Sequence, residues 1–408
     1  MKKSVLKKYA ELIAKTGINV QKGQDVVIRC DLDQPEFVKM VTEYCYKFGA
    51  RKVTIEWSYQ PLAKVHNKYC SVKTLATIEK WEEEKLKHNS LTLPALIWLD
   101  SEDPDGLKGM NEKKSAEAQR IRYPLIKPYR DAMENKYQWC IAAVPGKKWA
   151  KKVFPDLSVS QAMEKLWEAI LYTSRVDENP IEAWKKHNED LLNRCNYLNS
   201  LNLKSLTYKA SNGTDFTVGL IEKALFIGGG EETLGNKVYF NPNIPSEECF
   251  TTPKRGDIEG IVYSSKPLSY KGQLIENFWI KFEHGKVVDV HAEKNEHVLR
   301  EMVSMDEGAT MLGEVALIPY DSPISNLNIL FYNTLFDENA SCHLALGMGF
   351  PNCIKDFEKY SLEEIRQMGV NDSMIHVDFM IGTKDLSIVG TTKEGKQVQI
   401  FKDGNWAF

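Results

Sequence analysis

The sequence lacks the features that mark several large classes of protein. It has no CxxC pair, and its eight cysteines stand singly, so neither a zinc ribbon nor a thioredoxin-like redox site is expected. No apolar run approaches the roughly 18 residues of a membrane span. The 53 Lys and Arg residues nearly balance the 56 Asp and Glu residues, at a net charge of -3, so no basic surface for nucleic acid or anionic lipid is indicated.

Signals for export and several catalytic motifs are missing as well. Residues 1–17 predict an amphipathic helix and not a signal peptide, because their apolar residues are not contiguous. No HExxH, GxSxG or GxxxxGK[ST] motif occurs, so a zincin helix, a nucleophile elbow and a P-loop are not expected. We therefore expect a cytoplasmic protein with no nucleic-acid or membrane partner.

The first half of the chain alternates short apolar runs with longer helical patterns. Buried strands are predicted at residues 25–30, 52–57, 93–100 and 138–145. Helices are predicted at residues 35–48, 72–88 and 112–133, and again from 158 to about 197 with a break at Pro180. Strands that alternate with helices favour a parallel sheet with right-handed crossovers. Residues 1–203 are thus predicted to form a three-layer α/β domain with a mostly parallel sheet.

The second half changes character near residue 203. Alternating residues flank Asn212-Gly213, a strong signal for a β-hairpin. Further strands are predicted by GIVYSS, ENFWIKFEHGKVVDVHAE, LGEVALIP, MIHVDFMIG and QVQIFKDGNW, and helices are predicted at residues 296–305 and from about Asn339. Residues 204–408 are predicted to form a β-rich α+β domain, and it is this domain that carries the candidate site.

One carboxylate stands inside an apolar strand pattern. Glu314 is the only charged residue of MLGEVALIP, and burying an unpaired carboxylate costs several kcal/mol or forces its protonation. Either Glu314 lies at an exposed strand end or a cation accompanies it.

A histidine and an aspartate alternate in the strand MIHVDFMIG. Because alternate residues of a strand share a face, His376 and Asp378 point the same way. They form either a solvated polar face or a pair of metal ligands.

The stretch LFDENASCHLALG places acids and a histidine in an apolar run. A helix is predicted here, with Asn339 as its N-cap and Gly347 past its end. Asp337 and Glu338 would precede the helix, where its dipole favours acids. That placement does not explain His343. Glu338 and His343 flank the start of the helix, so both side chains can point toward the same site.

Two adjacent glutamates lie in a segment that is flanked by prolines. Glu247 and Glu248 stand between Pro245 and Pro253, in a segment that is predicted to be extended. Their side chains would point to opposite faces, so at most one can face a given site. A solvated loop is the alternative interpretation.

Converging carboxylates would repel one another unless cations balance them. Two divalent ions would do so, and the imidazoles would complete the coordination. Mixed oxygen and nitrogen ligands favour zinc, cobalt or manganese. Two ions about 3.5–4 Å apart can also hold a bridging water and lower its pKa. The candidate residues are Glu248, Glu314, Glu338, His343, His376 and Asp378.

A long block of the sequence resembles a known family. Residues 312–351, LGEVALIPYDSPISNLNILFYNTLFDENASCHLALGMGFP, are similar to the signature region of the aminopeptidase T / aminopeptidase S family of metallopeptidases, and NIPSEECFTTP and HVDFMIG match its other blocks in order. The resemblance implies a homodimeric aminopeptidase with two metal ions, which removes N-terminal residues from peptides. It also implies an α/β N-terminal domain and a metal site in the C-terminal domain.

The resemblance carries over to individual positions. By motif position the metal ligands are the six candidate residues above, and Glu314 would be the ligand between the ions. By elimination, Glu247 or Glu248 is the group that transfers a proton to the leaving amine. One position departs from the family, which often has a tyrosine seven residues after the motif histidine. Phe350 stands there, so this position offers no phenol to contact a metal or bind an oxyanion.

Two other functions are compatible with the same residues. A phosphoesterase-like metallohydrolase would use this ligand set, with Lys254 and Arg255 near the glutamate pair to bind phosphate. A non-catalytic peptide-binding relative would retain the fold without the ligands. All six ligand positions hold competent residues, which argues against this second alternative.

His291 and His297 are the main rival histidines for the site, and we expect them at the start of a surface helix.

Overall fold

The computed structural model describes Met1–Phe408 and divides into two compact units. Unit 1 comprises Met1–Lys186 and Gly230–Pro245, and unit 2 comprises His187–Gly229 and Ser246–Phe408. These units differ from the predicted division at residue 203. The chain returns to unit 1 because Asn243–Ile244 forms the fifth strand of its sheet. No helix is both long enough and apolar enough to cross a membrane.

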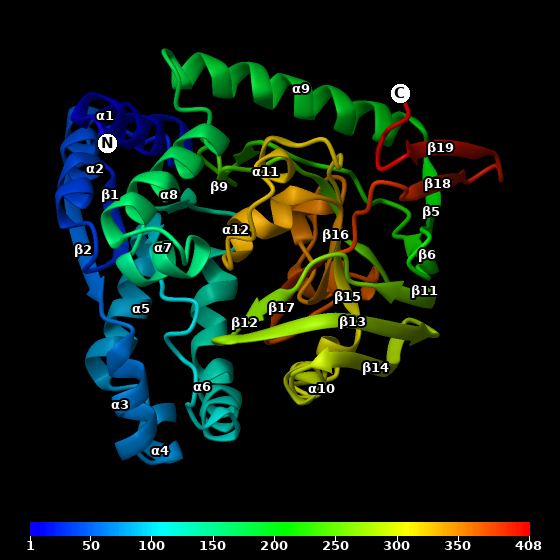
Figure 1. Cartoon of the computed structure of the whole chain (residues 1–408), viewed down its shortest axis with the longest axis horizontal. Coiled ribbons are helices and arrows are strands. Elements are labelled where there is room, and N and C mark those ends of the chain that lie inside the picture. The colour runs from blue at the N-terminus through cyan, green and yellow to red at the C-terminus, as the bar shows by residue number, and fades with distance from the viewer. The chain divides into compact units, whose positions relative to one another are not determined.

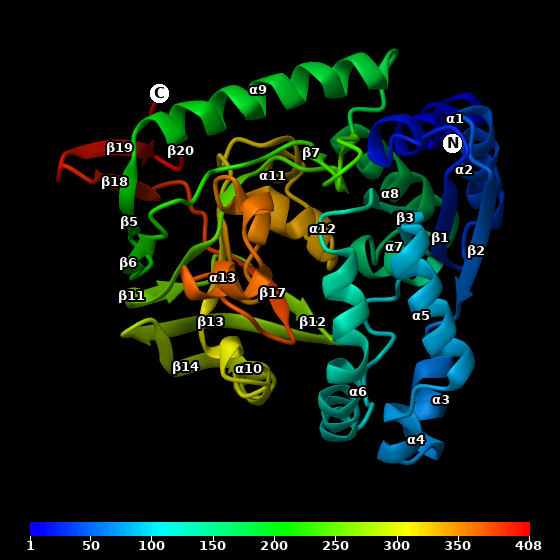
Figure 2. The same cartoon turned by 180° about the vertical axis from the view of Figure 1, so that it is seen from behind.

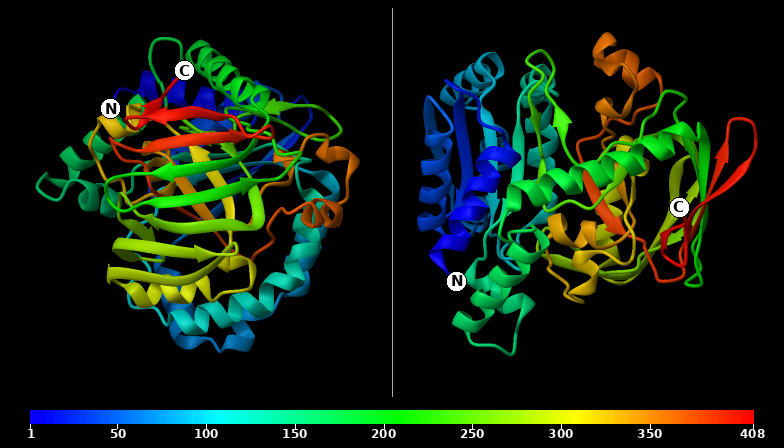
Figure 3. Two further views of the ribbon diagram at one scale, coloured as in Figure 1. Left: turned by 90° about the vertical axis from the view of Figure 1, so that its right-hand side faces the viewer. Right: turned by 90° about the horizontal axis from the view of Figure 1, so that it is seen from above.

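Unit 1 contains a parallel sheet with helices on both sides (Figures 1 and 3). The strand order is β2–β1–β3–β4–β9, and every neighbouring pair is parallel. By the right-handed crossover rule, the helix after β1 covers one face and the helices after β2 and β3 cover the other. The three-layer α/β prediction is confirmed. The strands are β1 (Asp25–Asp31), β2 (Lys52–Ser58), β3 (Ala95–Asp100), β4 (Trp139–Ala143) and β9 (Asn243–Ile244).

The predicted helices of unit 1 are present with one correction, and the structure adds two that were not predicted, Pro61–Tyr69 and Lys147–Val153. The single helix predicted at residues 72–88 is two helices, because Glu79 is extended and caps α5 by a reciprocal pair of hydrogen bonds with Glu82. The long helix α6 has the predicted bounds, although it contains Pro124 and Pro128. The helices are α1 (Lys3–Leu12), α2 (Pro35–Lys47), α3 (Pro61–Tyr69), α4 (Val72–Ala76), α5 (Lys80–Thr92), α6 (Glu112–Met133), α7 (Lys147–Val153), α8 (Val159–Thr173) and α9 (Pro180–Ser200), of which α9 continues into unit 2.

Unit 2 contains a large antiparallel sheet, seen face-on in the left view of Figure 3. Its order is β12–β13–β11–β6–β5–β18–β19–β20, and β14 also pairs with β13. The hairpin predicted around Asn212-Gly213 joins β5 to β6. Helix α10 (Glu296–Val303) lies beside β13 and β14 (Figure 2). The strands are β5 (Leu203–Lys209), β6 (Asp215–Leu220), β11 (Pro253–Tyr263), β12 (Leu268–Tyr270), β13 (Gln273–Glu283), β14 (Lys286–Lys294), β18 (Ser387–Thr392), β19 (Gln397–Lys402) and β20 (Asn405–Trp406).

A second sheet of unit 2 has four strands and is almost completely buried. Its order is β10–β15–β16–β17, with antiparallel pairing throughout. Its members are β10 (Cys249–Thr251), β15 (Leu312–Leu317), β16 (His343–Gly347) and β17 (His376–Met380). The short helices α11 (Pro323–Asn326) and α12 (Thr334–Asp337) lie between β15 and β16 in the chain, and α13 (Leu362–Gln367) precedes β17.

The predicted helix starting at Asn339 is wrong. Glu338–Ala340 is one turn of 3-10 helix, and His343–Gly347 is the strand β16 between β15 and β17. An apolar run of five residues has no period that distinguishes helix from strand, so cross-strand pairing decides its structure. Gly347 has a φ of +106°, which ends the strand.

Candidate metal centre

The four-stranded sheet of unit 2 presents the candidate ligands on one face. Ala345 of the central strand β16 pairs with Glu314 on one side and with Asp378 on the other. Directly paired residues of antiparallel strands project to the same face, and so do residues two apart on a strand. His343 and His376 therefore join Glu314 and Asp378. The small residues Ala345 and Gly347 leave space between them.

The adjacent glutamates of the Ser246–Glu248 segment point in opposite directions, as predicted. Phe250 of β10 pairs with Ala316, which shares a face with Glu314, and Glu248 stands two residues before Phe250. Glu248 accordingly reaches the cluster, where its Oε2 lies 3.5 Å from Nε2 of His343. The carboxylate of Glu247 instead lies against His187, with Oε2 3.8 Å from Nε2.

Two groups of three ligands share one carboxylate. Glu248, Glu314 and His343 form the first group, and Glu314, His376 and Asp378 form the second. Oε1 of Glu314 lies 4.0 Å from Nε2 of His343, and its Oε2 lies 3.1 Å from Nε2 of His376. Glu314 is only 4% exposed, which excludes the strand-end alternative. Its two oxygens therefore face different histidines, as a bridging ligand would.

Both histidines are oriented by backbone carbonyls. Nδ1 of His343 donates to the carbonyl of Glu338 at 2.8 Å, and Nδ1 of His376 donates to that of Met348 at 2.8 Å. With the proton held on Nδ1, Nε2 is the nitrogen left to bind an ion, which is the usual arrangement of metal-binding histidines. Nε2 of His376 is also within hydrogen-bond distance of Oε2 of Glu314, at 3.1 Å. Gly313 permits this geometry, because a Cβ there would lie 2.0 Å from the Met348 carbonyl oxygen.

Burial and like charge make these carboxylates costly to ionise together. Burial, reinforced by Glu314 and Asp378, raises the pKa of Glu248 well above its usual range. Burial and the charge of Asp378 do the same to the pKa of Glu338. Burial alone would also raise the pKa of Asp378, but His376 lowers it to about 2. A bound cation would allow every carboxylate to ionise.

The donor set fits divalent metal ions. Oδ1 of Asp378 is buried without a hydrogen-bond partner, and it lies 3.2 Å and 3.9 Å from Nε2 of His376 and His343. Carboxylate oxygens and imidazole nitrogens gathered this closely have the spacing of ligands around a shared ion. Carboxylate oxygens with imidazole nitrogens are the ligands of zinc, cobalt and manganese sites.

Two residues that the sequence did not indicate also support the site. Asn339 and His187 are buried polar residues that hydrogen-bond to the same peptide group, the one between Ser246 and Glu247. Asn339 accepts its N–H, and His187 donates to its carbonyl. The sequence pattern predicts Asn339 only as a helix cap, and His187 lies in the helical pattern of α9, where a lone histidine carries no signal of its partner.

Other candidates lie away from the cluster or have different roles. Lys254 and Arg255, considered for phosphate binding, are exposed, and Lys254 lies 3.6 Å from Asp257. His291 and His297 are both exposed, as predicted, but only His297 lies at the start of helix α10. His291 belongs to strand β14, and it lies 2.8 Å from Glu296. Asp337 accepts backbone N–H groups, among them that of Phe331 at 2.8 Å. Burial raises the pKa of Asp337 to about 6.

Phe350 lies beside the cluster. Its ring centroid is 4.9 Å from that of His376 and 5.4 Å from that of Phe250. The position where the family often has a tyrosine therefore borders a candidate ligand, and here it presents an apolar ring.

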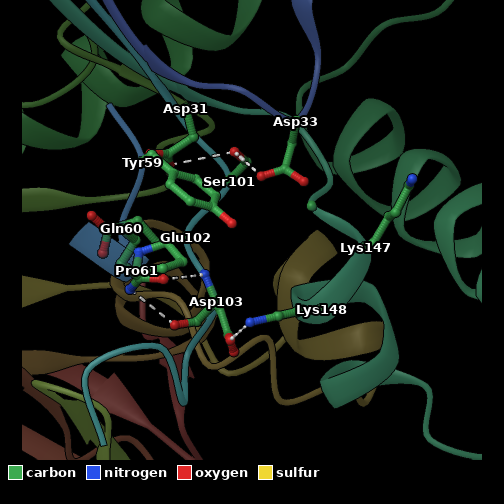
Figure 4. A pocket seen from close by; sticks show the side chains of 11 residues that line it. Asp31, Asp33, Tyr59, Gln60, Pro61, Ser101, Glu102, Asp103, Lys147 and Lys148 are labelled. Carbon is green, nitrogen blue, oxygen red and sulfur yellow. Dashed lines mark hydrogen bonds and ion pairs between the residues drawn. The ribbon is translucent and has the colours of Figure 1, made fainter. Parts of the chain in front are cut away.

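A separate cavity of about 230 Å³ lies in unit 1 at the carboxyl ends of β1, β2 and β3 (Figure 4). Its carboxylates have polar neighbours in unit 1. Ser101 Oγ lies 3.5 Å from both Asp31 and Asp33, and Asp103 lies 3.3 Å from Lys148. The cavity lining contains no histidine, so it differs in chemistry from the cluster of unit 2.

Comparison with known proteins agrees with this geometry. The model of the family described as thermophilic metalloprotease (M29) matches residues 2–406. The chain is 42% identical to aminopeptidase AmpS of Bacillus subtilis over 99% of this chain and 98% of that protein. It is 37% identical to aminopeptidase T of Thermus thermophilus over 98% of each. The structure of wild-type AmpT from Thermus thermophilus matches with a TM-score of 0.88 at 36% identity, covering 100% of both chains. The chain therefore belongs to the thermophilic metalloprotease (M29) family, and it is a metal-dependent aminopeptidase.

Proposed function

We propose that this aminopeptidase acts through two divalent ions held by one face of the four-stranded sheet and by the adjoining segments that carry Glu248 and Glu338. The observation that carries the proposal is the pair of ligand groups that share Glu314. A single ion would not need a carboxylate whose two oxygens face different histidines. The proposed ligands are Glu248, Glu314, Glu338, His343, His376 and Asp378.

The ions are zinc, cobalt or manganese, as the mixed ligand set indicates. When bound, they supply Lewis acids that polarise the scissile carbonyl and lower the pKa of an attacking water. The protein holds the ligands in place. The carbonyls of Glu338 and Met348 fix the two imidazole rings, and the buried sheet excludes water around Glu314.

Proton transfer is assigned to the adjacent glutamates, and Glu314 would be a ligand that the two ions share. Glu248 faces the cluster, so its carboxylate is placed both to bind an ion and to accept a proton there. Glu247 contacts His187 on the other side of the segment, and a role for Glu247 in proton transfer requires a movement of its side chain toward the cluster. The ligand role of Glu248 is therefore the better supported of the two.

Peptides with a free N-terminus are the substrates of an aminopeptidase, and the metal centre explains this requirement. A free α-amine has a lone pair that can serve as a ligand, so binding it would place the first peptide bond over the centre. Orienting reacting groups in this way contributes several kcal/mol, on the order of 7–11 in the best cases.

Metal content and substrate scope test the proposal together. Chelation to well below one ion per chain should abolish hydrolysis of Leu-amide and Leu-Gly, and added zinc, cobalt or manganese should restore it at two ions per chain. The N-acetylated forms should not be cleaved, because acetylation removes the basic lone pair. Full activity without metal, or equal hydrolysis of acetylated substrates, would contradict the proposal. Comparable hydrolysis of phosphate esters would favour a phosphoesterase instead.

A homodimer and a cytoplasmic location also remain predictions. Unit 1 exposes several large apolar side chains that a partner could cover, including Tyr69, Trp81 and Leu91 at 74%, 67% and 75%. Sedimentation equilibrium should return twice the 46.6 kDa of one chain. Fractionation of cells that express the protein tests its location.

A further inference from the structure

Asn339 is a buried polar residue between two parts of the proposed metal centre. Its side chain is 0% exposed and makes three hydrogen bonds. Nδ2 donates to the carbonyl of Leu335 at 3.1 Å and to Oε1 of Glu338 at 3.3 Å. Oδ1 accepts the backbone N–H of Glu247 at 2.7 Å. One amide thus joins the turn that carries Glu338 to the segment that carries Glu248.

The chemistry of these contacts requires an amide at this position. The oxygen faces an N–H donor, and the nitrogen faces two acceptors, so neither a reversed amide nor a carboxylate reproduces the three bonds. A reversed amide would bring two N–H groups together. An aspartate would retain the bond to the Glu247 N–H but would oppose the carboxylate of Glu338.

The two segments joined by Asn339 are also held by other hydrogen bonds. His187 Nε2 donates to the carbonyl of Ser246 at 2.7 Å, which anchors the segment before Glu248. The carbonyl of Glu338 accepts Nδ1 of His343 at 2.8 Å, which ties the turn to β16. Among these contacts, those of Asn339 connect the two segments directly. Its side chain therefore links the turn that carries Glu338 to the peptide group between Ser246 and Glu247, just before Glu248.

We propose that Asn339 is a positioning residue for the aminopeptidase reaction, because it holds Glu338 and the Glu247–Glu248 segment in a fixed relative position. The proposal rests on the metal centre proposed above. It does not require Asn339 to contact either an ion or the substrate.

The test compares Asn339→Ala with a matched variant, Asn199→Ala. The side chain of Asn199 also bonds a backbone carbonyl and a backbone N–H in unit 2, both of Phe226, at 2.9 Å and 2.7 Å. The metal-free proteins are titrated with cobalt(II) by calorimetry and by visible absorption, which reports coordination geometry. Thermal unfolding of the metal-free proteins and kcat and KM for Leu-amide at saturating cobalt are then measured.

We expect Asn339→Ala to bind cobalt at least about tenfold more weakly, with an altered absorption spectrum. Its kcat should fall by at least about tenfold even at saturating cobalt, since small displacements of reacting groups have large effects on rate, whereas KM should change little. Asn199→Ala should match the wild-type protein in cobalt affinity, spectrum and kcat, although both variants unfold at lower temperature.

The proposal is overturned if Asn339→Ala keeps the cobalt affinity, spectrum and kcat of Asn199→Ala. If Asn339→Ala does not fold, the isosteric Asn339→Asp decides. A fall in its kcat at saturating cobalt supports the proposal, and an unchanged kcat refutes it. The wild-type titration tests the two-ion site separately from the role of Asn339. Binding of a single ion by the wild-type protein would refute the two-ion site before any variant is compared.

Discussion

Glu314→Gln is the substitution that separates a bridging ligand from an ordinary buried carboxylate. Glutamine has nearly the same shape, so the packing of β15 should be retained while the charge between His343 and His376 is removed. Removing one partner of a buried charged pair costs about 3–5 kcal/mol. At about 1.4 kcal/mol per factor of ten, metal binding should weaken by roughly 10²- to 10⁴-fold.

The same loss can be measured as a loss of metal-induced stability. Wild-type protein at a metal concentration of 100 times Kd gains about 2.7 kcal/mol in the free energy of unfolding. If Kd rises 100-fold, the same relation leaves a gain of about 0.4 kcal/mol. The metal-free variant should unfold close to the metal-free wild type, because Glu314 both repels Glu248 and attracts His376, and these effects oppose one another.

The assay combines denaturant unfolding with and without metal, metal content and the rate of Leu-amide hydrolysis. The matched control is Glu259→Gln, which alters an exposed strand glutamate of unit 2 and should leave all three unchanged. The reasoning fails if Glu314→Gln retains two ions at wild-type affinity. It also fails if the metal-free variant is several kcal/mol less stable than the wild type, since Glu314 would then be a structural residue.

Three further predictions follow from the same geometry. Glu248→Gln should lose metal and activity together, whereas Glu247→Gln should keep its metal content, and equal metal loss in both would contradict the opposite orientations of their side chains. Phe350→Tyr should raise kcat, because a phenol beside His376 adds a hydrogen-bond donor that the phenyl ring lacks, and an unchanged kcat would show that another group stabilises the transition state. The apparent metal affinity should fall as the pH is lowered through the acid range, because the raised pKa values of Glu248 and Glu338 let protons compete with the metal at a higher pH than at an ordinary glutamate. An apparent Kd for cobalt that stays constant as the pH is lowered, measured by equilibrium dialysis, would contradict this direction.

Strand alternation predicted which side chains of the candidate site share a face. The i, i+2 spacing of His376 and Asp378 placed both on one face, and a charge inside an apolar strand indicated Glu314. Both arguments depend on local geometry, which the order of residues contains. The opposite directions of Glu247 and Glu248 followed from the same rule.

What the sequence could not predict depends on contacts between distant segments. The strand predicted as a helix begins at His343, and only its pairing with β15 and β17 makes it a strand. The side chain of His343 therefore belongs to a sheet and not to a helix. The two units could not be bounded either, because Asn243–Ile244 joins the sheet of unit 1 through β4, which lies about a hundred residues earlier in the chain.

The strand assignment of His343 accounts for the width of the site better than the predicted helix does. Neighbouring positions on one helix face lie about 5–6 Å apart, so one helix can offer two ligands to one point. Glu314 and Asp378 stand on either side of β16, and strands are spaced about 4.8 Å apart, so their backbones are separated by about 9.6 Å. Their side chains reach inward over Ala345, which is too small to fill the gap. Two ions about 3.5–4 Å apart need a space of this kind, with ligands on opposite sides and a bridging group near the middle.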